Sequence, residues 1–442
     1  MISLAEVRLW GRTIGAVQWD ESRQLGVFEY TPEFLRSGIE LSPLTMPLGA
    51  GRFSFPQLSE QTFMGLPGML ADALPDKFGN LLIDQWLVAH GRDPGSFNPV
   101  ERLLYMGRRG MGALEFAPAT RQQPAQSTPV EISELVVLAN RALNQKQALA
   151  VQLDSSATKK SSGKSEELAL NQIIAVGTSA GGARAKAVIA WNEETGEVRS
   201  GQCDVEKGFR HYLLKFDGVA ANRDKELADP QGYTRVEYAC YLMAKAAGIE
   251  MMPSRLLEEN GRAHFLTQRF DRTESGGKLH MQTLCGMAHY DFNVAGGYSY
   301  EQCFRVIRRV ISVAPRSALE QQFRRMLFNI LIRNQDDHTK NIGFLMNRKG
   351  EWSLAPAYDV TYAFNPDGAW TSQHQMSVNG RRSDFSLEDL YACGLAADLR
   401  KRHVDQILGE VAAAVRQWMT YANKAGVPDD WSSAIQATFR SL

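Results

Sequence analysis

Paired cysteines, net charge and long apolar runs are scarce in this sequence. The five cysteines lie far apart and never form C-x-x-C, which argues against a zinc site or disulfide framework and favours a reducing compartment. The 49 basic and 49 acidic side chains balance, so net charge favours neither nucleic-acid nor membrane binding. No uncharged apolar run approaches the ~18 residues that span a bilayer. The charged strand pattern around Glu6, Arg8 and Arg12 does not resemble a signal peptide, so we expect a cytoplasmic protein.

The 442 residues have the composition of a globular chain, with 44% hydrophobic and 22% charged residues. This length allows two or three domains. Short strands dominate residues 1–117, and residues 118–130 are rich in Pro, Gln, Ser and Thr and are typical of a linker. We predict a small lobe at residues 131–272, with a polar insert at 154–176, and a largely helical lobe at residues 273–442. Local patterns add finer predictions: a hairpin around residues 10–13, a capping or turn role for Asp76, strands at 187–191 and 211–217, a helical start at Met281, a helix at 387–393 capped by Ser386, and an amphipathic helical run at 396–418.

The octet N-Q-D-D-H-T-K-N, residues 334–341, lies between an apolar helical run and a strand-like segment. Asp336 stands five positions before Asn341, the spacing at which phosphoryl-transfer loops place a base and a metal-binding amide. Asp359 follows a short two-strand pattern, where a kinase keeps its second magnesium-binding Asp. A polar turn between a helix and a strand is the alternative interpretation of the octet.

Further upstream, three stretches could bind a nucleotide. The glycine-rich segment G-T-S-A-G-G-A-R-A-K, residues 177–186, could bring backbone amides and the charges of Arg184 and Lys186 to phosphates, or could simply be a hairpin turn. Lys215 ends a predicted strand and could reach the phosphates, although most lysines are solvated. Residues 268–271 follow a strand and are the candidate hinge for adenine and ribose.

Two predicted helices, at about residues 300–313 and 317–333, are strongly basic. Their arginines could form a nucleic-acid face, or a solvated face and ion pairs. The arginines of these helices and their flanks are Arg305, Arg308, Arg309, Arg316, Arg324, Arg325 and Arg333.

The order of these stretches, glycine loop, strand lysine, hinge, D-x-x-x-x-N loop and metal Asp, resembles the HipA family of serine/threonine kinase toxins. The resemblance extends over nearly the whole chain through W-G-R-T-I-G-A, A-L-P-D-K-F-G, G-G-A-R-A-K, H-Y-L-L-K-F-D, N-Q-D-D-H-T-K-N and A-P-A-Y-D-V. The last two, in this order, are specific to the family. It implies an α+β, two-lobed protein-kinase-like fold with a small N-terminal β-rich subdomain and a largely helical C-terminal lobe.

The resemblance also implies roles for individual residues, with ATP and Mg²⁺ as cofactors. Asp336 would be the base, His338 and Lys340 would face the phosphates, and Asn341 and Asp359 would hold magnesium. The implied nucleotide contacts are Gly181, Gly182, Ala183, Arg184, Lys186, Lys215, His338, Asn341, Gln268, Arg269, Phe270 and Asp271. Ser179 matches a serine whose autophosphorylation silences the family's kinases; a phosphate there would add a charge of roughly −1.5 to −2. Gln268 departs from the family, which has an acidic hinge residue.

The implied function is a toxin that phosphorylates a serine or threonine of a translation component. The family precedent is an aminoacyl-tRNA synthetase, specifically glutamyl-tRNA synthetase. A small HipB-like helix-turn-helix antitoxin would neutralise the toxin and supply most of the DNA binding. Two alternatives stay open: a small-molecule or lipid phosphotransferase, because D-x-H-x-x-N also occurs there, and a non-catalytic corepressor working through a DNA-binding partner.

Overall fold

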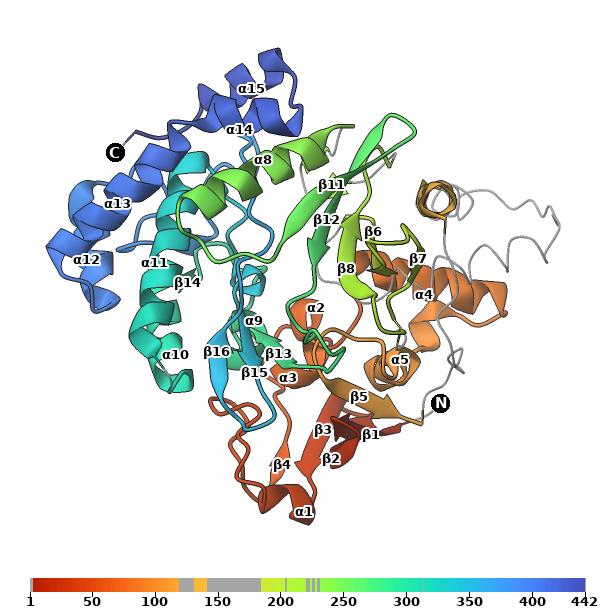
Figure 1. The fold of residues 1–442 in the computed structure, drawn as a ribbon. Coiled ribbons are helices and arrows are strands. Elements are labelled where there is room, and N and C mark those ends of the chain that lie inside the picture. Colours follow the sequence, from red (N-terminus) through yellow and green to blue (C-terminus); the bar gives the residue numbers. More distant parts are fainter. Residues whose placement is uncertain are drawn as a thin grey trace. The chain divides into compact units, whose positions relative to one another are not determined.

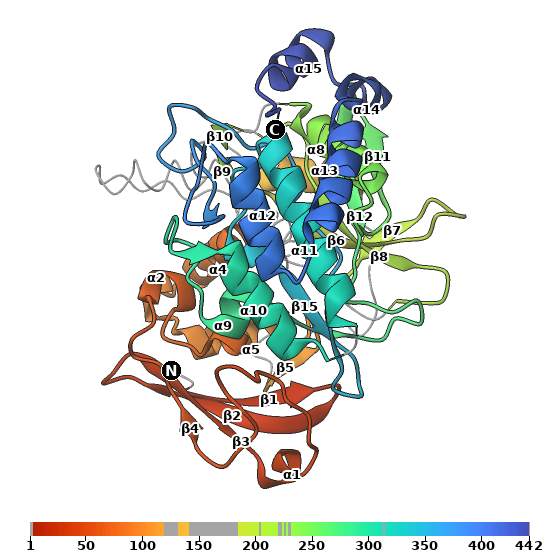
Figure 2. The same cartoon turned by 90° about the vertical axis from the view of Figure 1, so that its left-hand side faces the viewer.

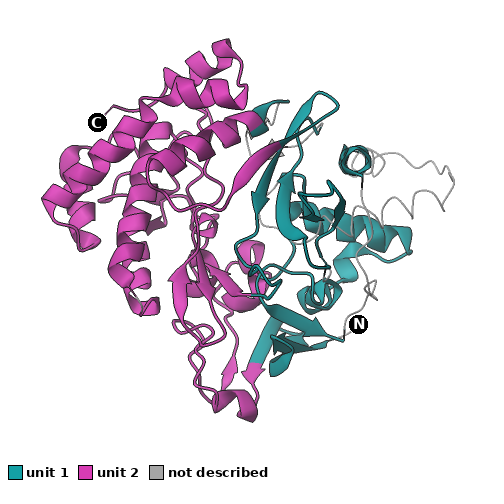
Figure 3. Cartoon of the chain, in the orientation of Figure 1, with its two compact units in different colours: residues 1–28, 73–234, 257–278 teal, residues 29–72, 235–256, 279–442 magenta. Residues whose placement is uncertain are grey.

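The computed structural model describes residues 3–118, 131–140, 184–202, 205–219, 223–224, 227–228, 231–312 and 314–441 (Figure 1). The chain forms two compact units, each assembled from three segments (Figure 3). Unit 1 comprises residues 1–28, 73–234 and 257–278, and unit 2 comprises residues 29–72, 235–256 and 279–442. The predicted domain boundaries describe a different, linear division and stay a prediction; most of the linker and the whole 154–176 insert lie outside the described residues.

The N-terminal strands form an antiparallel sheet in the order β3-β2-β1-β5. These strands are β1 (Leu4–Leu9), β2 (Arg12–Asp20), β3 (Leu25–Tyr30), which crosses into unit 2, and β5 (Leu114–Ala117). Trp10 and Gly11 make the predicted hairpin turn between β1 and β2, with φ angles of 50° and 79°. Along β1, Ala5, Val7 and Leu9 are buried while their neighbours are more exposed, the period-two pattern that the sequence predicted.

The second sheet of unit 1 has the strand order β11-β12-β8-β6-β7. Its strands are β6 (Lys186–Trp191), β7 (Val198–Ser200), β8 (Arg210–Lys215), β11 (Ser254–Glu259), which begins in unit 2, and β12 (Arg262–Gln268). A short pair, β9 (Arg223–Asp224) and β10 (Leu227–Ala228), lies apart from it. The predicted strands at 187–191 and 211–217 are thereby confirmed.

Helices cover this second sheet through one apolar core. They are α4 (Lys77–Ala89), α5 (Pro99–Met106), preceded by the 3₁₀ turn Pro94–Ser96, and the helical residues 132–140. Phe78, Leu82 and Tyr105 pack with sheet residues such as Ile189 and Leu214. Asp76 caps α4 by accepting a hydrogen bond from the Gly79 N–H at 2.6 Å, which confirms the capping role expected for it.

Unit 2 is largely helical, as Figure 2 shows. Its long helices are α8 (Tyr233–Ala246), which begins in unit 1, α10 (Tyr300–Val310), α11 (Pro315–Ile332), α12 (Leu387–Ala396), α13 (Lys401–Val415), α14 (Trp418–Ala425) and α15 (Asp429–Gln436). The short helices are α1 (Pro32–Leu35), α2 (Glu60–Phe63), α3 (Gly68–Ala71) and α9 (Leu284–Ala288). Helix α11 packs against α10 and α13. No helix in the part of the chain that the structure describes is apolar over a membrane-spanning length.

Unit 2 also contains short strands. The strands β13 (His280–Thr283), β15 (Gly343–Met346) and β16 (Trp352–Leu354) form one antiparallel sheet. The strands β14 (Tyr298–Ser299) and β17 (Met376–Ser377) pair in parallel, and β4 (Arg52–Phe53) is a short strand near the start of the unit. The predicted two-strand pattern after the octet is thus confirmed as β15 and β16.

Two expectations about helices are wrong. We expected a helical start at Met281, but β13 forms there because His280 and Gln282 are buried in alternation and the strand pairs with β15. We also expected one long helix over residues 396–418. Instead α13 covers only residues 401–415, because Asp398, with a left-handed backbone and φ of 59°, precedes its start, and α14 begins at Trp418; the helix expected at 387–393 is confirmed as α12.

Candidate functional site

The octet follows the end of α11 in unit 2. Arg333 ends the helix in a left-handed conformation with φ of 58°, which turns the chain sharply into Asn334. The loop then runs beside residue 363, because the Gln335 N–H donates to the Ala363 carbonyl at 3.0 Å. Its last residues, Thr339–Asn341, form a 3₁₀ turn that leads into β15. The loop is therefore fixed at both ends by backbone contacts.

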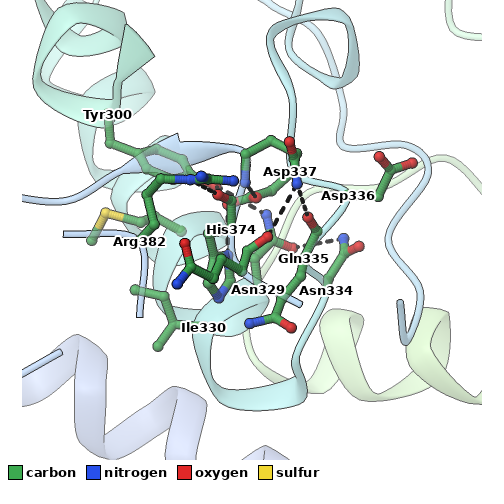
Figure 4. A network of polar contacts seen from close by, with 12 residues as sticks. Tyr300, Asn329, Ile330, Asn334, Gln335, Asp336, Asp337, His374 and Arg382 are labelled. Atoms are coloured by element: carbon green, nitrogen blue, oxygen red, sulfur yellow. Dashed lines mark hydrogen bonds and ion pairs between the residues drawn. The ribbon is translucent and has the colours of Figure 1, made fainter. Parts of the chain in front are cut away.

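The two consecutive aspartates of the loop have different surroundings. Asp337 is buried and accepts hydrogen bonds from Tyr300, His374 and the Gln375 backbone. The Asp336 side chain is 20% exposed, and its Oδ1 accepts from the Trp370 indole at 2.6 Å. Figure 4 shows Asp336 pointing away from the network that surrounds Asp337. Of the two carboxylates, Asp336 is therefore the one that a substrate hydroxyl could reach.

Asn341 closes the loop onto its own start. Its Nδ2 donates to the Asp336 carbonyl oxygen at 2.9 Å. Because the amide nitrogen makes this bond, the amide oxygen is the atom that could ligate a cation. This geometry suits the metal-binding role predicted for Asn341.

Asp359 lies in the adjoining segment with an uncommon backbone conformation, φ of 52°. Asn334, Asp337, His338, Asn341 and Asp359 are among the residues that line one cavity of about 20 Å³. This volume has room for roughly one water-sized occupant. Carboxylate and amide oxygens are ligands that Mg²⁺ accepts, so the residues present fit such an ion.

Two further octet residues, His338 and Lys340, lie close to the ring of Phe292. The Lys340 Nζ stands 4.9 Å from the centre of the Phe292 ring, and the His338 ring centre lies 5.2 Å from it. The His338 Nε2 is 3.8 Å from Asp336 Oδ1, longer than a hydrogen bond. The Tyr358 hydroxyl donates to the Lys340 carbonyl at 2.6 Å and holds the loop near Asp359.

In unit 1, two of the predicted phosphate-binding lysines are neighbours. Lys186 in β6 and Lys215 in β8 face each other across the antiparallel ladder, and both are buried. The Lys186 Nζ lies 3.6 Å from an Asp76 carboxylate oxygen. Like charges opposite each other on a sheet repel, so a bound anion would stabilise this pair. Arg184 stacks over the Tyr233 ring at 4.2 Å.

The hinge candidate follows β12 in unit 1. The Arg269 N–H donates to the His211 carbonyl at 2.9 Å, and Gln268 pairs with Tyr212. Asp271 is fully buried; it accepts two bonds from the Arg269 guanidinium and one from the Gly112 N–H at 2.7 Å. Burial raises the pKa of Asp271, but the Arg269 and Arg272 guanidiniums outweigh burial and hold it well below its ordinary value.

Among the described residues, these contacts give Asp271 a structural role. Its predicted contact with a ribose stays a prediction. The same holds for Gln268, Arg269 and Phe270 at the adenine. Ser179 and the glycine-loop residues Gly181, Gly182 and Ala183 lie outside the described residues.

Sequence reasoning missed the partners of the two aspartates. Trp370, His374 and Gln375 lie in the polar segment after Asp359, and the sequence offered only the absence of a metal-ligand spacing around His374. Nothing in that segment indicates which residues it contacts some 35 positions earlier.

The basic helices also differ from a continuous charged face. Arg324 is buried and donates to Glu410 at 2.7 Å, and Arg325 is buried and donates to the Ala355 carbonyl at 2.8 Å. Burial lowers the pKa of Arg325 to about 10. A nucleic-acid role is wrong for these two arginines, because their side chains are committed to the interior of unit 2.

Known proteins resemble this chain in sequence and in fold. Two Sinorhizobium fredii proteins, "Putative kinase Y4mE" and "Putative kinase Y4dM", are 26% identical over 203 residues and 28% identical over 189 residues. These matches cover 42% and 39% of this chain, but only 46% and 45% of the relatives. The chain therefore spans about half the length of these relatives.

Among solved structures, a chain in the Shewanella oneidensis MR-1 toxin–antitoxin complex of HipA, HipB and operator DNA superposes with a TM-score of 0.64. The match covers 98% of this chain and 94% of that chain at 18% identity, which shows a shared fold. The α+β, HipA-like fold class expected from the sequence is confirmed.

Family profiles account for most of the chain. The HipA N-terminal domain matches residues 5–117, and the HipA-like C-terminal domain matches residues 178–419, which include the octet and Asp359. The match to the HipA-like C-terminal domain alone covers more than half of the chain, so the chain belongs to the HipA family.

Proposed function

We propose that this protein is an ATP- and Mg²⁺-dependent serine/threonine protein kinase that acts as the toxin of a toxin–antitoxin pair. The observation that carries the proposal is the arrangement of the octet. A partly exposed carboxylate at Asp336 stands where it can accept the proton of an attacking hydroxyl, and Asn341 and Asp359 line the adjoining cavity. Phosphoryl transfer needs this combination of a base and an ion that neutralises the phosphates.

Each implied cofactor has candidate residues. Magnesium would be held by Asn341 and Asp359 and would neutralise charge on the transferred phosphate. Lys186 and Lys215 would bind the phosphates of ATP, since both are buried cations on neighbouring strands. His338 and Lys340 would face the transferred group, and Asp336 would take the proton from the substrate hydroxyl.

The biological target extends the proposal. The acceptor would be a serine or threonine on a translation component, an aminoacyl-tRNA synthetase such as glutamyl-tRNA synthetase. A HipB-like helix-turn-helix antitoxin would neutralise the kinase and supply most of the DNA contact. The fold shared with a chain from a HipA–HipB–DNA complex supports such partners. Phosphorylation of Ser179 would silence the kinase, because the added negative charge would repel ATP.

Radiolabelled ATP tests the central point. Purified protein is incubated with labelled ATP, Mg²⁺ and cell extract, and label is followed in proteins and in small molecules. Label in a protein band that depends on Mg²⁺ is the expected result. Label in small molecules would instead indicate a small-molecule or lipid kinase, and no transfer by folded protein would indicate a non-catalytic corepressor.

A second experiment tests the regulatory residue. Ser179→Ala should lose self-labelling but keep transfer to the target, since it removes only the acceptor hydroxyl. Self-labelling that persists in this variant would place the regulatory site elsewhere.

A further inference from the structure

We infer that Asp337 and His374 form a positioning pair that sets the orientation of the catalytic carboxylate Asp336; this inference rests on the proposed kinase function. The Asp337 side chain is 1% exposed, and its carboxylate accepts three hydrogen bonds. Oδ2 accepts from the Tyr300 hydroxyl at 2.8 Å and from the His374 Nδ1 at 2.9 Å, and Oδ1 accepts from the Gln375 backbone N–H at 2.8 Å. The network is visible in Figure 4. A buried carboxylate bonded in this way has one orientation.

The tautomer of His374 follows from its second contact. Its Nε2 lies 2.8 Å from an Arg440 Nη1, and a guanidinium can only donate. Nε2 must therefore accept, which places the ring proton on Nδ1 and aims it at Asp337. The backbone N–H of Arg440 donates to the Leu331 carbonyl of α11 at 2.9 Å. The C-terminal segment thus fixes the proton that His374 offers to the loop.

The same segment that holds Asp337 also contacts the base. Trp370 precedes His374 by four residues and donates its indole N–H to Asp336 at 2.6 Å. The Gln375 side chain donates to the Gln335 carbonyl at 3.2 Å. Residues 370–375 therefore contact three consecutive loop residues, Gln335, Asp336 and Asp337. A shift of this segment would move the indole away from Asp336. The Asp337–His374 bond therefore also helps to keep the indole N–H against the Asp336 carboxylate.

Two substitutions at His374 separate its two hydrogen bonds. In His374→Asn the amide nitrogen occupies nearly the place of Nδ1, so it can still donate to Asp337 but cannot reach Arg440. In His374→Gln the amide group occupies nearly the place of Nε2, so it can still meet Arg440 but leaves Asp337 without this donor. The two variants therefore test whether the bond from His374 to Asp337 or the bond from Arg440 to His374 positions the loop.

The expected results differ in kcat. We expect His374→Gln to lower kcat ~10- to 100-fold with an unchanged KM for ATP, because small misplacement of a reacting group has effects of this size. We expect His374→Asn to keep kcat within a few-fold of wild type. His403→Gln, at a partly exposed histidine of α13, is the matched control and should behave as wild type.

Hydrogen exchange provides a readout that does not require activity. Amides of residues 334–341 should exchange faster in His374→Gln than in His374→Asn or wild type, because the loop loses an anchor. If His374→Gln does not fold, Tyr300→Phe removes another donor to Asp337 while keeping the ring, and it should lower kcat and speed the same exchange.

The outcomes separate the two proposals. A folded wild type that transfers no phosphate would overturn the proposed function but leave the exchange experiment valid. Wild-type kcat and exchange in His374→Gln, or in Tyr300→Phe if it replaces that variant, would overturn the positioning role. Equal losses in the Asn and Gln variants would also overturn it, because the bond to Asp337 would not be the cause.

Discussion

Asp271 in unit 1 and Asp336 in unit 2 are both aspartates in predicted sites, and the structure surrounds them differently. Asp271 has no exposed surface and is held by two arginines and a backbone N–H. Asp336 keeps a fifth of its side chain exposed and accepts from an indole. A base must reach the proton it removes, whereas a carboxylate enclosed by fixed cations contributes to the architecture.

A third aspartate shows that arginines, and not burial, lower the pKa of Asp271. Asp72 in unit 2 is largely enclosed and accepts a hydrogen bond from the Thr283 N–H at 2.7 Å. Burial raises the pKa of Asp72 despite opposing contributions from Lys340 and Thr283. Single substitutions can therefore test whether Asp271 stabilises the fold and Asp336 serves as the base.

The largest expected effect is at Asp336, the carboxylate proposed as the base. Asp336→Asn keeps the shape but removes the base, so turnover should fall by roughly 10²- to 10⁴-fold while the free energy of unfolding stays near that of wild type. Labelled-phosphate transfer under single-turnover conditions measures the change. Asp367→Asn, at an exposed aspartate, is the matched control. Wild-type turnover in Asp336→Asn would show that another group is the base.

The next effect is on stability. Asp271→Asn removes a buried charge and leaves Arg269 and Arg272 without their anionic partner, so the free energy of unfolding should fall by about 3–5 kcal/mol. Denaturant unfolding measures it, with Glu194→Gln at an exposed site of unit 1 as the control. A loss no larger than that of the control would mean that the arginines find other partners.

The pH dependence of stability sharpens this test. The folded-state pKa of Asp271 lies below its ordinary value, so its contribution is fully present above the unfolded pKa of ~3.9 and is lost as pH falls toward the folded value. The stability difference between wild type and Asp271→Asn should therefore shrink by ~2 kcal/mol between about pH 5 and the folded pKa. Asp72 is present in both proteins and cancels. A difference that stays constant with pH would contradict this assignment.

The smallest effect concerns the indole that meets the base. Trp370→Phe removes the donor to Asp336 and should lower kcat by about 3- to 10-fold, the size expected for one hydrogen bond. Steady-state kinetics measures it, and Trp431→Phe in α15 serves as the matched control. An unchanged kcat would mean that Trp370 acts only by packing.

Local patterns predicted much of the fold. Alternation predicted β1 and β3, strand-like apolar runs predicted β6 and β8, and Ser386 was correctly expected to cap α12, where its side chain accepts from the Asp389 N–H. The helix expected over residues 396–418 is shorter in the structure, where α13 covers residues 401–415, because the pattern stays amphipathic across Asp398, whose backbone is left-handed. Such a break depends on the backbone of one residue and leaves little trace in hydrophobic periodicity.

The sequence by itself indicated the family and the candidate residues of the octet, because Asp336, Asn341 and Asp359 are recognised by spacing along the chain. Only the tertiary structure decided how the neighbouring aspartates divide their roles. Asp337 turns inward to Tyr300, His374 and Gln375, while Asp336 stays partly exposed beside Trp370. Hydrogen bonds between residues some 35 positions apart depend on how the segments pack, and spacing along the chain carries no record of that packing.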